Sequence, residues 1–179
     1  MELTAALRTT GAVRDFTDVP VDDAVVARVL DTARFAPSGA NAQPWRVVVV
    51  KDAERRRRLQ DLYVTGWRDY LAMTVAGLRP WAPTNDRDAE ARALAAGHET
   101  AGSADWFGRA PVLLALFADL SALAAVDRDA ERYGFAGGAS IYPFAWSVLL
   151  AAREEGLGGV ITTIAIRAEP QVKALLGAS

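Results

Sequence analysis

A short polar loop between two apolar segments constrains the fold of this chain more than any other stretch. Residues 36–45 read Ala-Pro-Ser-Gly-Ala-Asn-Ala-Gln-Pro-Trp, and four consecutive valines follow at 47–50. Two prolines and a glycine exclude a helix here, while Ser38, Asn41 and Gln43 offer short, uncharged donors and acceptors. Such a loop is either a tight connection between core elements or a site for a planar, hydrogen-bonding ligand.

Helical patterns flank this loop on both sides. Apolar residues between Val25 and Ala33 recur at helical spacing, and Asp22 and Asp23 favour a helix start. The residue before Pro37 is driven away from helical angles, so this helix must end before the loop. The predicted helices span 2–9, 22–34, 52–73, 86–97, a part of 119–133, 137–155 and 169–176.

Three apolar, β-branched runs predict strands at 46–51, 110–118 and 160–166. The four valines of the first run are typical of a sheet that is buried on both faces. Residues 77–85 contain two prolines and are predicted to be irregular, as a candidate lid, and Gly102-Ser103 marks another break. Together these elements predict one α+β domain over residues 1–179.

Composition excludes several kinds of site and partner. The chain has no cysteine, which excludes disulfides, zinc–thiolate sites and cysteine nucleophiles, and its single histidine, His98, argues against a histidine-based metal site. The net charge is −2, so no nucleic-acid partner is expected. The sequence shows neither a signal peptide nor an apolar run long enough to span a bilayer, so we expect no membrane partner and a cytoplasmic location.

The sequence contains no familiar constellation of catalytic side chains. Paired carboxylates, a Ser/His/Asp arrangement, a P-loop and a Gly-x-Gly-x-x-Gly fingerprint are all absent from it. This pattern fits chemistry that an organic cofactor carries. Arg14 is either a surface residue or a phosphate clamp, because a guanidinium donates two parallel hydrogen bonds to phosphate. The run 158–163 is explained by a helix cap and a strand, and its alternative role is to offer backbone donors to a ligand.

Three motifs, in this order along the chain, resemble those of the nitroreductase family of FMN-dependent enzymes. They are Arg14-x-Phe16, the loop 37–45, and Gly156–Gly159 followed by Thr162-Thr163. The resemblance implies a nitroreductase-like α+β fold, with a central, mostly antiparallel or mixed sheet flanked by helices, and a homodimer with FMN at its interface. It also implies a ping-pong reaction, in which a hydride passes from NAD(P)H through FMN to a nitroaromatic, quinone or similar small electrophile.

The same resemblance assigns roles to individual residues. Arg14 and Thr10 would belong to the FMN phosphate site, and loop residues contributed by the partner subunit would meet the flavin ring. The segment around Thr163 would lie along the other side of the ring, chiefly through its backbone. No catalytic side chain and no metal ligand are implied. The implied cofactor-binding residues are Thr10, Arg14, Pro37, Ser38, Gly39, Asn41, Gln43, Thr162, Thr163 and Ile164.

The sequence departs from the family pattern in two places. The family's phosphate motif reads Arg-Arg/His-Ser-x-Arg, and here Thr10, Gly11 and Ala12 occupy its first three positions, so a positive charge is lost. The Thr10 hydroxyl and the Gly11 backbone remain as donors. Family members also continue beyond the last helix with a strand and a basic segment, whereas this sequence ends at Ser179, as a shortened form or as a member that functions without that tail.

These departures leave alternative functions open. One is a non-catalytic protein that binds or sequesters flavin, and another is a degenerate family member that acts as a dimeric interaction module. No pattern in the sequence distinguishes NADH from NADPH, FMN from a deazaflavin, or one electron acceptor from another.

Overall fold

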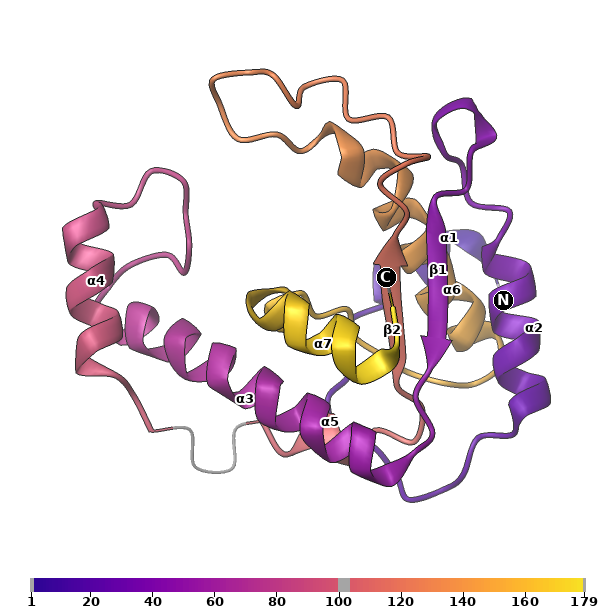
Figure 1. Ribbon diagram of the computed structural model, residues 1–179. Helices are drawn as coiled ribbons and strands as arrows, with labels where there is room; N and C mark the ends of the chain where they lie inside the picture. The colour runs from indigo at the N-terminus through magenta and orange to yellow at the C-terminus, as the bar shows by residue number, and fades with distance from the viewer. Residues whose placement is uncertain (1, 100–103, 179) are drawn as a thin grey trace. The chain divides into compact units, whose positions relative to one another are not determined.

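The computed structural model describes residues 2–99 and 104–178 (Figure 1). These residues group into two compact units. The predicted break at Gly102-Ser103 lies outside the described residues. The prediction of a single domain over 1–179 stays a prediction. The first unit is Met1–Val49 with Pro111–Ile161, and the second is Val50–Ala110 with Thr162–Ser179.

The first unit contains an antiparallel pair of strands that lie side by side in Figure 1. These are β1 (Trp45–Val49) and β2 (Leu114–Ala118), with Val47 opposite Leu116. Both strands were predicted. β2 begins later than expected, at Leu114, which pairs with Val49, the last residue of β1. The prediction of a sheet buried on both faces is wrong. Each strand has a single neighbour within the described residues, and the valines of β1 are only half-buried.

The helices of this unit confirm the predicted pattern around the loop. Helix α2 packs against α6, and Arg28 on α2 donates two hydrogen bonds to the Glu155 carboxylate that follows α6. Helix α6 starts with Pro143 in its first turn, and the predicted glycine cap is Gly156, at φ +79°. The helical elements of the unit are α1 (Leu3–Thr9), α2 (Asp23–Ala33), the 3₁₀ turns η1 (Gly39–Asn41) and η2 (Ala136–Ser140), and α6 (Tyr142–Glu154).

The core of the first unit lies where the loop meets β1. The rings of Trp45 and Phe144 stack with centroids 4.6 Å apart, over the buried Ala33 and Ala36. Pro44 is among the most completely buried side chains of the chain. Pro44 and Trp45 therefore anchor the loop in the core.

The predicted helix within 119–133 is wrong, because these residues form turns and bends. Two aspartates accept hydrogen bonds from backbone N–H groups and fix the chain in these turns. Asp119 accepts from the Ser121 amide at 3.1 Å, and Asp127 accepts from the Phe135 amide at 2.9 Å and from the Ala136 amide at 3.1 Å. A continuous helix would separate residues eight apart by about 12 Å along its axis. The bonds from Asp127 to Phe135 and Ala136 are therefore incompatible with a helix that continues from Asp127.

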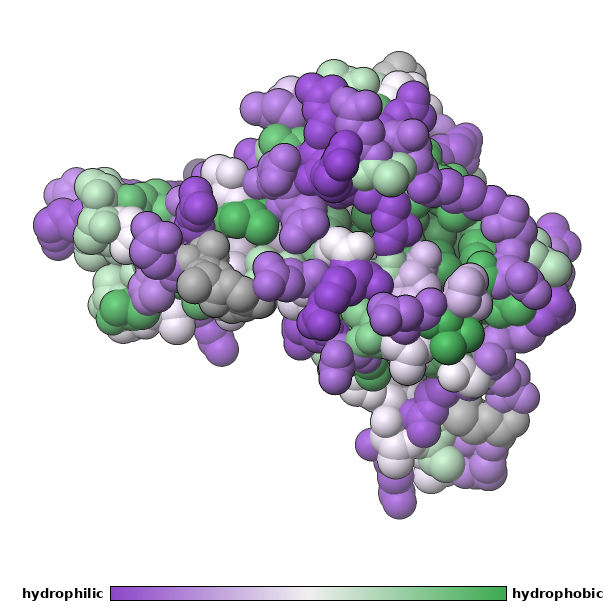
Figure 2. Space-filling view, turned by 90° about the horizontal axis from the view of Figure 1, so that it is seen from below, coloured by the Kyte–Doolittle hydropathy of each residue, from purple (hydrophilic) through white to green (hydrophobic). Residues whose placement is uncertain are grey.

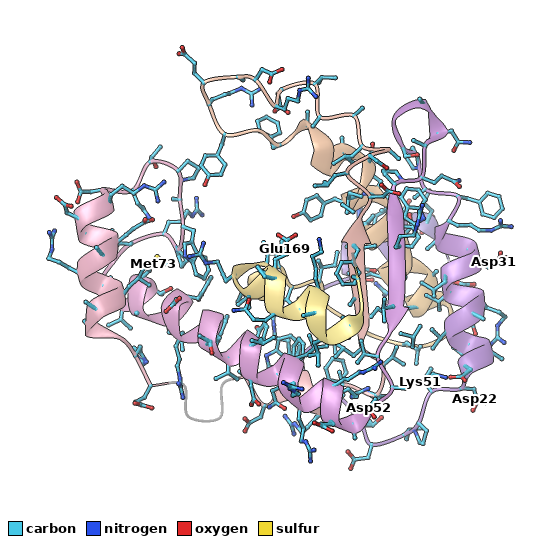
Figure 3. The ribbon with its side chains drawn as sticks, viewed as in Figure 1. Asp22, Asp31, Lys51, Asp52, Met73 and Glu169 are labelled. Atoms are coloured by element: carbon cyan, nitrogen blue, oxygen red, sulfur yellow. The ribbon has the colours of Figure 1, made fainter. Side chains whose placement is uncertain are left out.

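The second unit is helical, and its other elements gather along the long helix α3. Asp52, at the start of α3 in Figure 3, caps it by accepting from the Arg55 amide at 2.8 Å, and Asp86 caps α4 in the same way. The predictions at 52–73, 86–97 and 169–176 are confirmed, whereas α5 was not predicted. The elements are α3 (Ala53–Val75), α4 (Arg87–Ala96), α5 (Trp106–Arg109), the 3₁₀ turn η3 (Ile164–Ala168) and α7 (Glu169–Leu176).

Stacked aromatic rings hold α5 against α3. Tyr63 stacks on Phe107 with centroids 4.7 Å apart and meets the edge of Trp106 at 5.5 Å. One turn further along α3, Trp67 and Tyr70 stack at 4.9 Å. Aromatic pairs of this geometry add to the free energy gained from burial alone.

The predicted strand 160–166 is wrong. Residues 157–163 have no regular secondary structure, and η3 begins at Ile164. β-Branched residues favour a strand only where a neighbouring strand supplies ladder hydrogen bonds. Within the described residues, the only ladder joins β1 and β2.

The face of the molecule in Figure 2 shows mainly hydrophilic residues, with hydrophobic residues scattered among them. Figure 3 marks Asp22 and Asp31 near opposite ends of α2, where both carboxylates are exposed or partly exposed. Among the described helices, none combines the length and the apolar character that crossing a bilayer requires.

Candidate functional site

The loop 37–43 is held in shape by hydrogen bonds from its own side chains. The Ser38 hydroxyl accepts from the Gln43 amide at 2.9 Å, which closes the loop across its base. The Gln43 side chain donates to the Arg34 carbonyl at 3.3 Å and so ties the loop to the end of α2. Gln43 therefore supports the loop from within.

A second support comes from a distant part of the same unit. The Gly39 amide donates to the Ser140 hydroxyl at 3.0 Å, and Ser140 is buried at the end of η2. Asp127 in turn fixes the chain just before η2 by accepting from the Phe135 and Ala136 amides. The Phe135 amide is the main cause that holds the pKa of Asp127 below its usual value. Asp127, the start of η2 and Ser140 thus form a hydrogen-bonded platform that supports the loop at Gly39.

Three non-glycine residues of the loop have left-handed backbone angles. The φ values are +52° at Ala40, +54° at Asn41 and +48° at Gln43. This conformation is costly for a residue with a Cβ, and residues held in it are concentrated at functional sites. Pro37, Asn41 and Gln43 are also exposed. The loop therefore presents uncharged amide groups to solvent from a backbone that is fixed at some energetic cost.

A small cleft of about 120 Å³ lies between the end of α1 and the end of α6. The Val13 amide donates to the Gly159 carbonyl at 3.0 Å and joins its two sides. The approach is close, because a Cβ on Gly158 would lie 2.9 Å from the Val13 side chain. The cleft is lined by Thr9, Thr10, Gly11, Val13, Leu149, Arg153, Leu157, Gly158 and Gly159.

The charged group of this cleft is Arg153, which was not predicted. Its Nη1 donates to the Thr10 hydroxyl at 2.7 Å and to the Ala6 carbonyl at 3.3 Å, and its Nη2 donates to the Thr9 hydroxyl at 2.5 Å. The sequence indicated Arg153 only as a cation in the last turn of a helix, just before a glycine cap. That signal does not reveal a contact with the other end of the chain.

The two predicted phosphate-site residues differ in their surroundings. The Thr10 hydroxyl donates a hydrogen bond to the Ala6 carbonyl at 2.7 Å. Its proton is therefore engaged at the end of α1 and is not donated to a ligand as predicted. Thr10 instead orients Arg153 by accepting its hydrogen bond. Arg14 is exposed on the extended segment that follows α1.

The remaining predicted residues lie in the second unit, around the start of η3. Thr163 precedes η3, and its carbonyl accepts from the Ile166 amide at 3.0 Å. Ile164 packs against Gly66 of α3, where an added Cβ would lie 2.6 Å from the isoleucine Cγ2 atom. Thr162 is half-buried and Thr163 is exposed. The structure therefore gathers the loop residues, Thr10 and Arg14 in one unit and Thr162–Ile164 in the other.

The predicted residues belong neither to a metal-binding group nor to the larger hollow of the second unit. Within residues 2–99 and 104–178, no three His, Asp or Glu side chains form a group suited to a metal ion. A hollow of about 610 Å³ in the second unit contains none of the predicted residues. It is lined by Asp52, Glu54, Arg55, Arg58, Ala174 and Leu175.

Comparison with known proteins identifies relatives over nearly the whole chain. The sequence model of the nitroreductase family matches residues 7–179. The chain is 34% identical over 155 residues to 5,6-dimethylbenzimidazole synthase of Rhodospirillum rubrum, covering 82% of this chain and 61% of that protein. It is 26% identical over 166 residues to iodotyrosine deiodinase 1 of Rattus norvegicus, covering 93% of this chain and 53% of that protein.

A solved structure is similar in both fold and sequence. The FMN- and NADPH-dependent nitroreductase NfnB from Sphigopyxis sp. strain HMH superposes with a TM-score of 0.65 at 28% identity, covering 100% of this chain and 82% of that one. The chain spans about 61% and 53% of the lengths of the synthase and the deiodinase.

Proposed function

The chain belongs to the nitroreductase family, and on that basis we propose that it is an FMN-dependent oxidoreductase that passes a hydride from NAD(P)H to a small electrophilic acceptor, such as a nitroaromatic or a quinone. The observation that carries the proposal is the loop 37–43. Its backbone is strained, its base is closed by hydrogen bonds, and its exposed groups are uncharged amides. A fixed array of neutral donors and acceptors is suited to the polar edge of a flavin ring.

The donor set of the first unit fits FMN at both ends. The loop offers the Asn41 side chain and the flat ring of Pro37 to a planar, hydrogen-bonding group. The cleft at the end of α1 offers a cation, which suits a phosphate. The neutral groups of the loop suit the neutral ring of FMN, and the cation of the cleft suits its anionic phosphate.

The residues of this chain would bind and orient rather than react. Bound FMN would supply the hydride-accepting ring. Ser38 and Gln43 keep the loop in one conformation. Asn41 would fix the position of the flavin ring relative to the loop. Thr162, Thr163 and Ile164 are proposed to lie along the other side of the ring. Since hydride transfer needs no protein acid, no catalytic side chain is proposed.

The partners and the location of the enzyme are part of the same proposal. We propose a cytoplasmic homodimer in which the loop of one subunit completes the site of the other. The name of NfnB, which gives FMN and NADPH as its requirements, supports the choice of cofactor and reductant. The names of the synthase and the deiodinase describe other reactions. The acceptor is therefore proposed as a class, small electrophiles, and not as one compound.

A visible absorption spectrum tests the proposal directly. The purified protein, reconstituted with FMN, should show a flavin band that bleaches under anaerobic conditions when NADPH or NADH is added and returns when a quinone is added. A band that persists with both nucleotides would instead support a flavin-binding protein without turnover. A protein that takes up no flavin would contradict the proposal altogether.

A pair of variants at Asn41 tests the role of the loop. Asn41→Gly removes the side-chain amide while keeping a residue that tolerates φ near +54°. We expect it to weaken flavin binding by about tenfold, the equivalent of roughly one hydrogen bond, with little change in melting temperature. Asn41→Asp is the matched variant, because aspartate also tolerates this backbone region but offers only acceptors. Unchanged flavin affinity in both variants would remove Asn41 from the site.

A further inference from the structure

The cleft at the ends of α1 and α6 contains a cation that its neighbours do not neutralise. The three hydrogen-bond acceptors of Arg153 are two threonine hydroxyls and one backbone carbonyl, all of them uncharged. Arg28, on the neighbouring helix α2, shows the contrast. Its Nε and Nη2 both donate to the carboxylate of Glu155, at 3.0 and 2.6 Å.

The hydrogen bonds of Arg153 fix its orientation and leave donors available. A guanidinium has five N–H groups, and the contacts with Ala6, Thr9 and Thr10 use three of them. The Nε–H and the second Nη2–H of Arg153 meet no acceptor within the described part of the chain. The Thr10 hydroxyl donates its proton to the Ala6 carbonyl and accepts a hydrogen bond from Arg153. This second bond holds the guanidinium in place.

The segment next to the cleft also carries backbone N–H groups without an acceptor among the described residues. The segment that follows Thr10 is exposed, and the amides of Gly11 and Ala12 donate to no other group among residues 2–99 and 104–178. Gly11 lines the cleft itself, and a Cβ there would meet nothing within 4 Å, so no side chain crowds the cleft at this position. A guanidinium beside free amides is a donor set for an oxyanion.

The size of the cleft limits the ligand. Pockets that enclose a drug-sized ligand measure about 300–1,000 Å³, whereas this cleft measures about 120 Å³. It therefore suits a small anionic group and excludes a three-ring system. A phosphate monoester carries a charge of roughly −1.5 to −2 at neutral pH, which a single guanidinium only partly compensates.

We propose that Arg153 binds the phosphate monoester of the flavin nucleotide, and so restores from α6 the positive charge that Thr10, Gly11 and Ala12 do not provide. This inference rests on the proposed function. Thr9 and Thr10 are then positioning residues for Arg153. The cleft makes the protein selective for a phosphorylated flavin over one that ends in a hydroxyl.

The test is a comparison of FMN with riboflavin, which lacks the phosphate. Dissociation constants for both flavins are measured by fluorescence quenching for the wild type, Arg153→Gln and Arg153→Lys. We expect Arg153→Gln to weaken FMN binding by about 10- to 100-fold, the equivalent of one or two charge-assisted hydrogen bonds, and to leave riboflavin binding unchanged. Arg153→Lys should fall between the two, because it keeps the charge but loses the planar fork.

Two controls separate binding from folding. Arg28→Gln removes an arginine of the same pair of helices that the cleft does not include, and it should leave the ratio of FMN to riboflavin affinity unchanged. Inorganic phosphate should compete with FMN in the wild type and raise its melting temperature, and both effects should be lost in Arg153→Gln. Because the readout is a ratio of two affinities, a partial loss of folded protein does not mimic it.

The outcomes distinguish this inference from the one on which it rests. Equal losses for FMN and riboflavin in Arg153→Gln would show a structural residue and overturn the inference alone, as would an unchanged FMN affinity. Phosphate binding without any preference for FMN would mean that the cleft takes free phosphate, which overturns the assignment to the cofactor. A wild type that binds neither flavin would overturn the proposed function itself.

Discussion

Two segments that resemble the family's flavin contacts are built in opposite ways. The loop 37–45 is fixed by side chains: Ser38 closes its base, Ser140 supports its middle, and Trp45 anchors its end in the core. The segment 156–163 is shaped by its backbone. It begins at Gly156, at φ +79°, and one amide–carbonyl bond from Val13 reaches it at Gly159.

The difference shows where each segment is sensitive to substitution. A side chain that closes or supports the loop can be removed without altering the chain direction, whereas the glycine segment depends on the absence of a Cβ. The loop is therefore expected to respond to the loss of hydrogen bonds and packing, and the glycine segment to the addition of a single carbon atom.

The largest effect is expected at the anchor of the loop. Trp45→Ala removes the ring that stacks on Phe144 and should lower the free energy of unfolding by about 3–5 kcal/mol. Urea unfolding followed by circular dichroism measures this loss. Trp45→Phe, which keeps a ring in the stack, should lose clearly less. A loss for Trp45→Ala no larger than that of an ordinary surface substitution, about 0.5 kcal/mol, would show that the loop is not anchored here.

The glycine segment is tested by a matched pair of alanine substitutions. At both Gly156 and Gly11 an added Cβ meets nothing within 4 Å, but Gly156 alone of the two has a positive φ. Gly156→Ala should therefore cost about 1–2 kcal/mol of stability from backbone strain, whereas Gly11→Ala should cost almost nothing. Thermal unfolding of the two variants measures the difference, and equal melting temperatures would contradict the role of the backbone angle.

A smaller effect is expected at the platform under the loop. Ser140→Ala leaves the Gly39 amide without its acceptor and should lower stability by about 1 kcal/mol. Hydrogen exchange at Gly39 should accelerate by more than this global change explains, because the contact that protects it is local. Ser147→Ala, within α6, is a control for the loss of a serine hydroxyl. Unchanged exchange at Gly39 would mean that the loop holds its shape without the platform.

The smallest effect is a dependence on pH. The Phe135 amide and the other donors to Asp127 lower the pKa of this carboxyl in the folded state. The stability it contributes is therefore present above the pKa of the unfolded chain and is lost as pH falls through the folded pKa. At neutral pH the wild type should melt above Asp127→Asn, and the gap should narrow on acidification below about pH 4. The neighbouring, exposed Asp129→Asn serves as the control, and a gap that is constant with pH would exclude this linkage.

The parts of the fold that were predicted correctly have local causes. Pro37 stops α2 and the glycine at 156 caps α6, and each of these acts within one turn of the chain. The anchoring of the loop by Pro44 and Trp45 was also predictable, because large apolar residues beside a rigid turn leave water by packing into the adjacent core.

The errors have non-local causes. The run 160–163 has β-branched residues but no partner strand among the described residues, and no local pattern shows whether a partner exists. In 119–133, Asp127 reaches amides eight and nine residues away, which a helical period does not reveal. Arg153 was missed because its three acceptors lie at the opposite end of the sequence. The roles of the predicted cofactor-binding residues remain predictions.

The aromatic stack along α3 gives the second unit an optical signature of its own. Trp67 and Tyr70 stack with their ring planes 8° apart. Aromatic rings that are held by tight packing give near-ultraviolet circular dichroism, which disappears when the packing is lost. The first unit has a different chromophore pair in Trp45 and Phe144. Replacing one tryptophan at a time therefore assigns each spectral band to one half of the chain. The protein can then report, without any added label, whether its two halves melt together or in succession.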